Sequence, residues 1–358
     1  MTNRRTKHKS DRGSIARRLP GVTLLVLLAF NGQPALAQDE NQWRESVERA
    51  IAYLSVEVEK WRPENGCFSC HNNGDGARAL YLARTLGFEV PEKALAETTE
   101  WLRHPEKWDS NPGDPAVSDK KLARLQFSFA LAIAIQSDES SDNAALDEVL
   151  RSVLADQTES GYWRVDSSSE MGSPVTWGNP LATLYTIGIL TSLDGTEPSE
   201  KALSSARKGL RWLAGFEPKT TIGKTVQISA LSFEISEGQT DQPVDSGRLS
   251  RKAANACESL LDAQGSDGGW GPHAGTPSEV FDTAVVLFHL DECVVAEHSG
   301  RSAESARERA LQFLYRTQAA AGGWPETTRP SGGQSYAQHI STTAWALMAL
   351  LMEAIRSI

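Results

Sequence analysis

Gln264–Leu290 reads QGSDGGWGPHAGTPSEVFDTAVVLFHL, and this stretch decides the fold of the 358-residue chain. A Gln ends one expected helix, a Gly-rich turn places a Trp six residues later, and an almost wholly apolar helix follows. The same Gln-to-Trp spacing recurs at Gln157–Trp163 and at Gln318–Trp324. The three tryptophans are separated by 107 and 54 residues, close to two units and one. A fixed period near 54 residues predicts a repeat architecture.

The repeating unit has the pattern of a helical hairpin. Helical periodicity dominates from Trp43 onward, and alternating runs of β-branched residues are scarce. The expected pairs are 43–60 with 76–86, 92–103 with 120–136, 143–157 with 180–193, 200–214 with 222–235, 248–264 with 279–290, and 303–318 with 336–355. The first helix of a pair has one polar face, whereas the second, as in Thr342–Met352, is apolar nearly all round. We therefore expect an all-α (α/α)6 toroid of about six hairpins, with a right-handed solenoid of hairpins as the competing geometry.

The N-terminal segment has the pattern of a signal peptide. Seven basic residues between positions 4 and 18 precede the apolar run Gly21–Phe30, and Ala35-Leu36-Ala37 supplies small residues for cleavage. The apolar run is far shorter than the ~20 residues that span a bilayer. We expect residues 1–37 to be a signal peptide, 38–42 a linker and 43–358 a single toroid domain. An uncleaved N-terminal anchor is the alternative to export.

The charge balance limits the partners. The whole chain has 36 Lys and Arg against 46 Asp and Glu, and the expected cleavage removes seven basic residues and one acidic one, leaving a net charge of −16. Such an acidic chain is a poor partner for nucleic acid or for anionic lipid. Outside the N-terminal segment, no apolar stretch is long and uncharged enough to predict a transmembrane helix.

The Gln-to-Trp stretches resemble the repeats of squalene–hopene cyclases and protein prenyltransferases. That family is an α/α toroid in which the Gln caps an outer helix and stacks against the Trp. The resemblance extends from Trp43 to the C-terminus, and it implies the same fold here. Three repeats match well and three are degenerate, because Trp108 and Trp212 do not lie in such turns.

Ser278–Val286, which reads SEVFDTAVV, resembles the stretch that carries the catalytic acid of squalene–hopene cyclases. That family's Asp-x-Asp-Asp-Thr-Ala motif becomes Glu279, Phe281 and Asp282 in this sequence. The middle Asp is the proton donor, and Phe281 cannot donate a proton, so cyclisation of this kind is not expected. Thr276 and Glu279 fit a capping box. Asp282 stays a candidate catalytic or ligand-lining residue, against a hydrogen-bonded structural role.

Three other chemistries lack their residues. Protein prenyltransferases bind zinc through an Asp-x-Cys and a later His, but the matching positions here hold Asp282-Thr283-Ala284 and Thr342. Complement-like thioester domains need a Glu-Gln after Gly-Cys, and it is absent after Gly66-Cys67. Gly74–Ala79 matches a loose dinucleotide-binding pattern, yet no strand precedes it. The sequence therefore gives no support to these three activities.

Cys67-Phe68-Ser69-Cys70-His71 has the C-x-x-C-H pattern of covalent haem c attachment. In such a site both thiols form thioethers and His71 supplies the proximal nitrogen. Export suits this chemistry, and Met171 and His104 are candidate sixth ligands. The alternatives are a local disulfide or free thiols, and a small structural metal clip. Cys257 and Cys293 could meet across a helical hairpin, although each is more typical of a buried apolar residue.

We expect the toroid to bind an isoprenoid or another apolar ligand without cyclising it. The ligand should lie where the inner helices begin, because helix N-termini contribute positive potential there. The expected lining residues are Trp177, Asn179, Phe281, Asp282 and Tyr336. The alternatives are a redox domain with haem at Cys67, Cys70 and His71, a protein-interaction scaffold, and a divergent terpenoid cyclase that uses Asp282. The sequence leaves open whether the protein is an enzyme.

Overall fold

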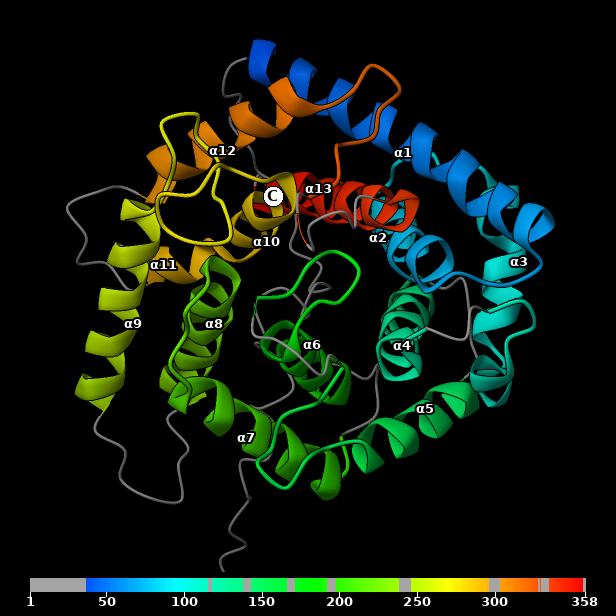
Figure 1. Ribbon diagram of the computed structural model, residues 1–358, viewed down its shortest axis with the longest axis horizontal. Helices are drawn as coiled ribbons and strands as arrows, with labels where there is room; N and C mark the ends of the chain where they lie inside the picture. Colours follow the sequence, from blue (N-terminus) through cyan, green and yellow to red (C-terminus); the bar gives the residue numbers. More distant parts are fainter. Residues whose placement is uncertain are drawn as a thin grey trace, which may run out of the picture.

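The computed structural model describes residues 37–114, 118–137, 143–165, 171–191, 198–237, 246–295, 303–327, 329 and 335–356. Figure 1 shows its helices arranged as two concentric rings. Within the described ranges there is no β-strand, and only two isolated bridges occur, Gln157 with Trp163 and Trp270 with Glu279. The expectation of an all-α toroid is confirmed. The expected signal peptide lies outside the described residues except for Ala37.

Helices of the outer ring and helices of the inner ring alternate along the chain (Figure 1). The outer helices are α1 (Ala37–Asn65), α3 (Glu92–Leu102), α5 (Asn143–Ala155), α7 (Glu200–Gly215), α9 (Ser246–Asp262) and α12 (Ala303–Thr317). The inner helices are α2 (Ala77–Thr85), α4 (Lys120–Gln136), α6 (Asn179–Thr191), α8 (Thr221–Glu237), α10 (Val280–His289) and α13 (Tyr336–Arg356). A π-helical turn, η2 (Cys70–Gly76), leads into α2, while η3 (Pro105–Ser110) and α11 (Asp291–Val295) are short connections.

The boundaries follow the sequence pattern closely, with one difference at the start. Residues 38–42, expected as a linker, are helical and form the first turns of α1. They contain no Gly or Pro, so nothing in this segment interrupts the helix.

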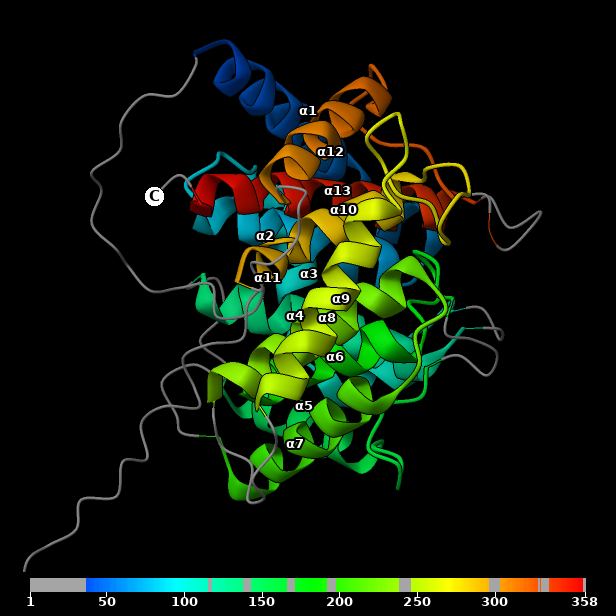
Figure 2. The ribbon, with the colours of Figure 1, turned by 90° about the vertical axis from the view of Figure 1, so that its left-hand side faces the viewer.

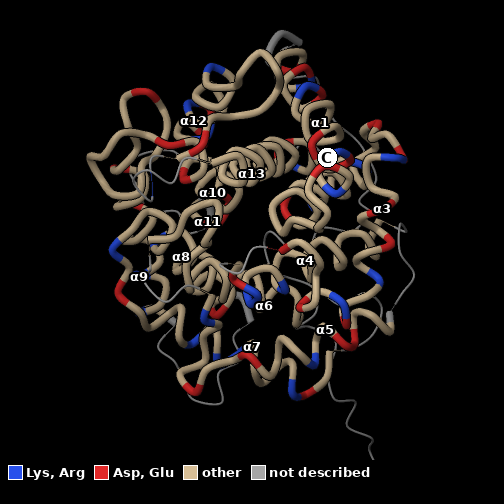
Figure 3. Tube along the Cα trace, turned by 45° about the vertical axis from the view of Figure 1, so that its right-hand side comes forward, with Lys and Arg blue, Asp and Glu red and all other residues tan. Residues whose placement is uncertain are grey.

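Burial separates the inner helices from the outer ones. Along α6 every residue from Pro180 to Thr191 is buried, and every residue of α10 is buried too. On α7 the buried residues recur at helical spacing, with Ala202, Ala206 and Leu210 on one face. Figure 3 shows the Lys, Arg, Asp and Glu residues gathered mainly on the outer ring. Each outer helix therefore has one face exposed to solvent, as its amphipathic pattern predicts.

Each of the three Gln-to-Trp turns joins its outer helix to the next one. Gln264 Nε2 donates to the carbonyl oxygen of Gly268 in its own turn, at 2.7 Å, and to that of Ala306 in α12, at 2.8 Å. Trp270 is fully buried; its Nε1 donates to Leu260 O at 2.8 Å, and its backbone N–H donates to Thr283 Oγ1 at 2.8 Å. The Gln side chain thus bridges two outer helices, and the Trp ties the turn to the inner helix.

The other two turns repeat these bonds. Gln157 Nε2 bonds to Gly161 O and to Ser205 O on α7, both at 2.8 Å, and Gln318 Nε2 bonds to Gly322 O and to Ser46 O on α1, both at 2.9 Å. The last bond joins the sixth outer helix to the first. This contact closes the ring, which decides for a toroid and against an open solenoid.

The start of α10 differs from the expected capping box. Thr276 Oγ1 donates to His273 O at 2.7 Å, and the residue before α10 is Glu279, which makes no side-chain cap bond. The Glu279 carboxylate is drawn instead to Arg329. Glu279 therefore pairs with Arg329, which is distant in the sequence, and does not form the expected capping box.

Figure 2 shows the rings edge-on, with the loops that carry the Gln-to-Trp turns on one side and the end of α13 on the other. A disulfide between Cys257 on α9 and Cys293 on α11 joins two neighbouring elements. From the sequence, each of these cysteines was more typical of a separate buried residue. In the structure, the helical hairpin brings the two together. Within the described ranges no helix is both long and apolar enough to cross a membrane.

Candidate functional site

Aromatic side chains from several inner segments meet at the axis of the toroid. Tyr185 of α6 lies 5.1 Å, ring centre to ring centre, from Trp345 of α13, and Trp177 lies 5.8 Å from Trp345. Phe281 of α10 packs edge-on against Trp345 at 5.9 Å, and Phe129 of α4 packs against Tyr185 at 4.9 Å. All five rings are buried. Two of the expected ligand-lining residues, Trp177 and Phe281, therefore belong to one axial cluster.

The guanidinium group of Arg78 lies inside this cluster. Its Cζ is 4.9 Å from the ring centre of Trp345, 5.1 Å from Trp177, 5.5 Å from Phe129 and 5.7 Å from Tyr185. Such distances give favourable cation–π contacts. Arg78 is also 3.2 Å from Asp75 Oδ1 in a buried ion pair, although its nitrogens make no hydrogen bond to any described residue. The guanidinium cation of Arg78 thus lies against the faces of the axial rings.

The carboxylate of Asp75 connects Arg78 to two other inner helices. Its Oδ2 accepts hydrogen bonds from Gln126 Nε2 of α4 and from Ser341 Oγ of α13, both at 2.8 Å. Burial raises the pKa of Asp75, while Arg78, Ser341 and Gln126 act to lower it. Asp75 and Arg78 were not among the residues predicted from the sequence. Two charged residues opening an otherwise apolar inner helix are the signal that could have identified them.

Asp282, the carboxylate left open by the sequence, is buried in a second ion pair. Arg329 NH2 donates to Asp282 Oδ2 at 2.7 Å, and Arg329 also binds Glu279. Burial raises the pKa of Asp282 to about 6, with Arg329 acting in the opposite direction. Asp282 Oδ1 is buried without a hydrogen-bond partner among the described residues. Asp282 therefore has a clear structural partner, which the sequence could not identify because Arg329 lies in a distant loop.

Trp177 has an uncommon backbone conformation. Its φ angle is +57°, the only positive value among the described residues other than glycine. A bulky residue in this left-handed region costs about 1–3 kcal/mol and persists only where its surroundings hold it. Here Trp177 is fully buried, with Trp345 and Tyr185 against its ring. The turn thus directs the indole into the axial cluster.

The remaining expected lining residues lie outside the axial cluster. Asn179 opens α6, and its Oδ1 accepts from the backbone N–H of Val165 at 3.2 Å. Tyr336 opens α13, stacks on Trp61 of α1 at 5.3 Å and is 38% exposed. Its hydroxyl donates to Glu57 and accepts from Asn72 Nδ2 at 2.8 Å. We call the half-exposed pair Trp61 and Tyr336 the mouth pair; Asn72 places it beside the C-x-x-C-H turn.

The C-x-x-C-H residues open the first inner helix. Ser69 Oγ accepts from the backbone N–H of His71 at 3.1 Å, which caps η2, and His71 Nδ1 lies 3.0 Å from Ser341 Oγ. Cys67 is buried, Cys70 is half-buried, and neither is in a disulfide. Burial raises the pKa of the Cys70 thiol and lowers that of His71 to about 4. Cys70 is therefore a poor nucleophile, because the thiolate is the reactive form.

Neither candidate sixth ligand is in contact with His71. His104 Nδ1 lies 3.0 Å from Glu106 and its Nε2 lies 3.3 Å from Glu100, while Met171 is exposed. Within the described part of the chain, no three His, Cys, Asp or Glu side chains gather closely enough to hold a metal ion. The described residues therefore offer no ligand set for the metal clip.

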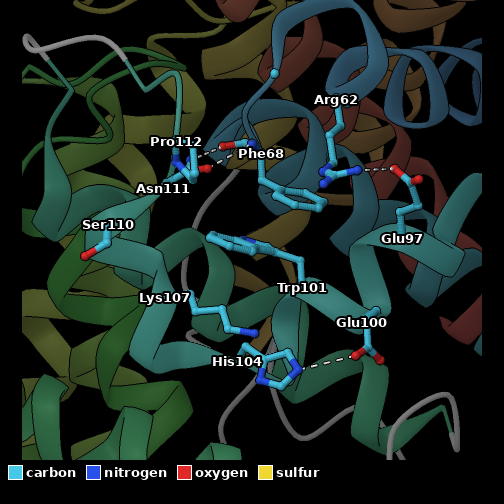
Figure 4. Close-up of a pocket in the computed structure, with 11 residues that line it drawn as sticks. Arg62, Phe68, Glu97, Glu100, Trp101, His104, Lys107, Ser110, Asn111 and Pro112 are labelled. Carbon is cyan, nitrogen blue, oxygen red and sulfur yellow. Dashed lines mark hydrogen bonds and ion pairs between the residues drawn. The ribbon is translucent and has the colours of Figure 1, made fainter.

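A groove of about 530 Å³ lies next to Phe68, the second residue of the C-x-x-C-H motif (Figure 4). Phe68 stacks on Trp101 of α3 at 4.5 Å, and the Arg62 guanidinium lies 5.0 Å from the Phe68 ring centre. Figure 4 shows Glu100, His104 and Lys107 along one edge. Asn111 holds the Phe68 backbone from the other side, through bonds of 3.1 and 2.7 Å. No local sequence pattern predicts this groove, because residues of three separate elements line it.

Searches with known protein families and with characterised proteins find no match to this sequence. Similar folds occur among solved structures. The type II terpene cyclase MstE from Scytonema, in complex with geranylgeranyl dihydroxybenzoate, aligns with a TM-score of 0.56 at 14% identity, over 90% of this chain and all of that one. A possible GH105 family member from Klebsiella pneumoniae gives 0.57 at 11% identity, over 93% of this chain and all of that one.

An unsaturated glucuronyl hydrolase specific for heparin gives a TM-score of 0.59 at 8% identity, over 89% of this chain and 99% of that one. At these identities the likeness is one of fold. The neighbours span terpene cyclisation and sugar hydrolysis, so function here must be argued from this chain's own residues. The comparisons therefore establish an α/α toroid with terpene cyclase-like and glycoside hydrolase-like neighbours.

Proposed function

We propose that this protein is an exported toroid that binds an isoprenoid or another apolar ligand without proton-initiated cyclisation. The supporting observation is a set of aromatic rings at the starts of inner helices: Phe281 near the start of α10, Trp177 just before α6, and Tyr336 at the start of α13, stacked on Trp61. The axial rings are packed around Arg78, so the ligand lies above them on this proposal, against the half-exposed mouth pair Trp61 and Tyr336. Stacked aromatic rings offer a large apolar surface with a polar edge.

Three features argue against cyclisation. Phe281 occupies the position of the proton donor in the resembling cyclases, and Asp282 is held in an ion pair with Arg329. Arg78 already occupies the ring faces that would stabilise a carbocation. A second positive charge at the same faces would be repelled. A divergent cyclase that relies on Asp282 would have to work against this ion pair and against Arg78.

The disulfide favours the exported part of the proposal. Disulfides persist in oxidising compartments and are rare in the cytosol. Cys257 and Cys293 are paired across α9 and α11. Sequencing of the mature N-terminus tests this directly, with Gln38 expected as the first residue.

The ligand proposal is tested on protein purified from the periplasm. Organic extraction and mass spectrometry should recover a lipid, and polyprenyl alcohols should raise the melting temperature more than straight-chain alcohols of equal length. Tyr336→Ala should lose this shift, whereas Tyr162→Ala, at the stacked outer pair with Trp212, should keep it. No extractable lipid and no thermal shift would end the proposal. A cyclic product from squalene would instead favour the divergent cyclase.

A c-type haem protein is the second candidate, favoured by a specific observation at the C-x-x-C-H turn. Among the described residues His71 has a ring partner at Nδ1 only, and Cys67 and Cys70 are unpaired in a chain whose other two cysteines are joined. The residues present fit haem: two thiols that add across vinyl groups, each forming one C–S and one C–H bond, and an imidazole nitrogen for iron. Haem would supply one-electron redox chemistry, and this chain would hold and orient it.

Expression with a cytochrome c maturation system tests the haem candidate. A Soret band that survives acid-acetone extraction supports it, and Cys67→Ser with Cys70→Ser should abolish the band. The matched control is Cys257→Ser with Cys293→Ser, which removes the disulfide pair and should leave the haem in place. If the wild type binds neither haem nor lipid, a protein-interaction scaffold becomes the better explanation.

A further inference from the structure

We propose that Ser341 and Asp75 are positioning residues for His71, fixing its ring in the Nδ1–H tautomer with Nε2 bare as a nitrogen donor. That Nε2 of His71 binds haem iron rests on the second candidate function. That His71 is held in the Nδ1–H tautomer does not depend on that function. We define the chain His71, Ser341 and Asp75 as the relay.

The relay is a continuous line of hydrogen bonds. His71 Nδ1 lies 3.0 Å from Ser341 Oγ, and Ser341 Oγ donates to Asp75 Oδ2 at 2.8 Å. These bonds join the π-helical turn η2 to α13, across 270 residues of sequence. Asp75 and Ser341 are fully buried, whereas His71 is half-buried. The relay therefore runs from the axis of the toroid outward to the C-x-x-C-H turn.

The direction of the bonds follows from the surroundings of Asp75. Arg78 is 3.2 Å from its Oδ1, and the amide nitrogen of Gln126 donates to its Oδ2. A carboxylate between a guanidinium and an amide N–H acts as an acceptor, so Ser341 must give its single proton to Asp75. Ser341 Oγ can then only accept from the imidazole. His71 consequently carries its proton on Nδ1.

A second histidine shows what a purely structural arrangement looks like. His289 on α10 has both ring nitrogens engaged, with Nε2 at 3.3 Å from Tyr185 Oη and Nδ1 at 3.2 Å from Ser229 Oγ. His71 has a partner for Nδ1 alone within the described part of the chain. His71 is half-buried, so its Nε2 can meet solvent or a ligand. His273 also has a bond to Nδ1 alone, so it is the place of His71 in the C-x-x-C-H turn, together with the open Nε2, that marks it as a ligand-donor position.

This arrangement matches what metal-bound imidazoles require. The second ring nitrogen of such a ligand is normally bonded to a carboxylate or another acceptor, which fixes the tautomer and increases ligand basicity. In this chain the carboxylate acts through a serine hydroxyl. Removal of the hydroxyl should free the ring to rotate and should weaken its donation to iron. A stronger imidazole donor favours the ferric state, so its loss should raise the midpoint potential.

The tautomer is measured without haem, on the whole mature chain labelled with ¹⁵N-histidine. We expect the two-bond ¹H–¹⁵N pattern of an Nδ1–H imidazole for His71, assigned by its disappearance in His71→Gln. Ser341→Ala should move His71 toward the Nε2–H form, which free imidazole side chains prefer. Thr342→Val is the matched control, because Thr342 Oγ1 is buried on the same helix without a partner. A wild-type Nε2–H pattern, or no change in Ser341→Ala, would overturn the proposal.

The iron assignment is measured after expression with the maturation system. Ser341→Ala should keep covalent haem and shift the midpoint potential upward, whereas Thr342→Val should leave the potential unchanged. A wild type without haem ends the haem function, and the tautomer measurement then still decides the positioning role. Equal potentials in wild type and Ser341→Ala would remove the relay's role toward iron. Circular dichroism and melting curves identify any variant that fails to fold.

Discussion

Gln318, just beyond the last residue of α12, donates a hydrogen bond of 2.9 Å to the backbone carbonyl of Ser46 in α1, 272 residues earlier. Its side-chain oxygen also accepts from Ser46 Oγ at 2.8 Å. The same glutamine thus bonds to the first outer helix in both directions. This pair joins the ends of the outer ring.

The first prediction concerns this closure. Gln318→Ala removes several hydrogen bonds at once, and because each contributes about 0.5–1.5 kcal/mol, we expect a loss of roughly 2–3 kcal/mol in unfolding free energy. Urea denaturation measures it. Gln312→Ala, at an exposed position of the same helix, is the control and should change little. Equal stabilities of the two variants would mean that the ring is closed by packing alone.

The second prediction separates close packing from backbone strain. Gly322 has φ +100°, and an added Cβ would lie 2.2 Å from Arg49 O on α1. Gly322→Ala should therefore cost well above the ~1 kcal/mol of a strained φ alone. Gly87→Ala supplies the comparison, since Gly87 has φ +82° with nothing within 4 Å of its Cβ. Similar melting temperatures for the two variants would show that α1 yields to the methyl group.

The third prediction concerns the Arg78–Asp75 ion pair. Arg78→Met leaves a buried carboxylate without its cation, and removing one partner of a buried pair costs about 3–5 kcal/mol. Adding Asp75→Asn should recover part of that loss, because the double variant buries no charge at this site. A double-mutant cycle in urea measures the coupling. Strictly additive losses would show that the cation–π contacts, rather than Asp75, hold Arg78 in place.

The fourth prediction concerns pH. Burial raises the folded-state pKa of Asp282 to about 6, above its unfolded value near 4, so the folded state binds this proton more tightly. Its contribution to stability is full below about pH 4 and is lost as pH rises to about 6, a change of roughly 2–3 kcal/mol. Asp282→Asn should remove this part of the pH dependence. Asp147→Asn, at an exposed site on α5, should leave the wild-type profile intact.

The fifth prediction concerns the disulfide. Cys257 and Cys293 enclose a loop with a sequence separation of 36 residues. The chain-entropy model assigns roughly 4 kcal/mol to a crosslink of that length. Replacement of both cysteines by serine should lower the unfolding free energy by a large part of that amount. Thiol labelling of the denatured wild type with and without reductant checks the bond: Cys67 and Cys70 should label without reductant, and Cys257 and Cys293 should label only after reduction.

The sequence predicts the fold well because the fold depends on short-range patterns. Gln264 and Trp270 lie six residues apart, and the apolar helix after them is continuous, so one stretch contains both the turn and the inner helix. The resemblance to squalene–hopene cyclases predicts that the helical hairpins close into a ring. The structure supplies the reason: each Gln reaches the next outer helix, and the Trp binds a Thr of its own inner helix.

The candidate sites depend on contacts that no local pattern contains. Arg78 meets rings from three other inner helices, and Asp282 meets Arg329, which lies 47 residues away in a connecting loop. Phe281 and Trp177 lie at or just before the starts of inner helices, and both belong to the axial cluster. Tyr336 and Asn179 also open inner helices but have other surroundings. The role of each expected ligand residue stays a proposal.

Ring closure has a consequence for the order of folding. Trp43 Nε1 donates to Leu350 O at 2.8 Å, a contact between residues 307 positions apart. During synthesis, α1 emerges long before α13, so it can pack early on α2 and α3 but not on α13. Contacts of such large sequence separation slow folding. The seam between α1 and α13 can therefore form only after nearly all of the chain is present.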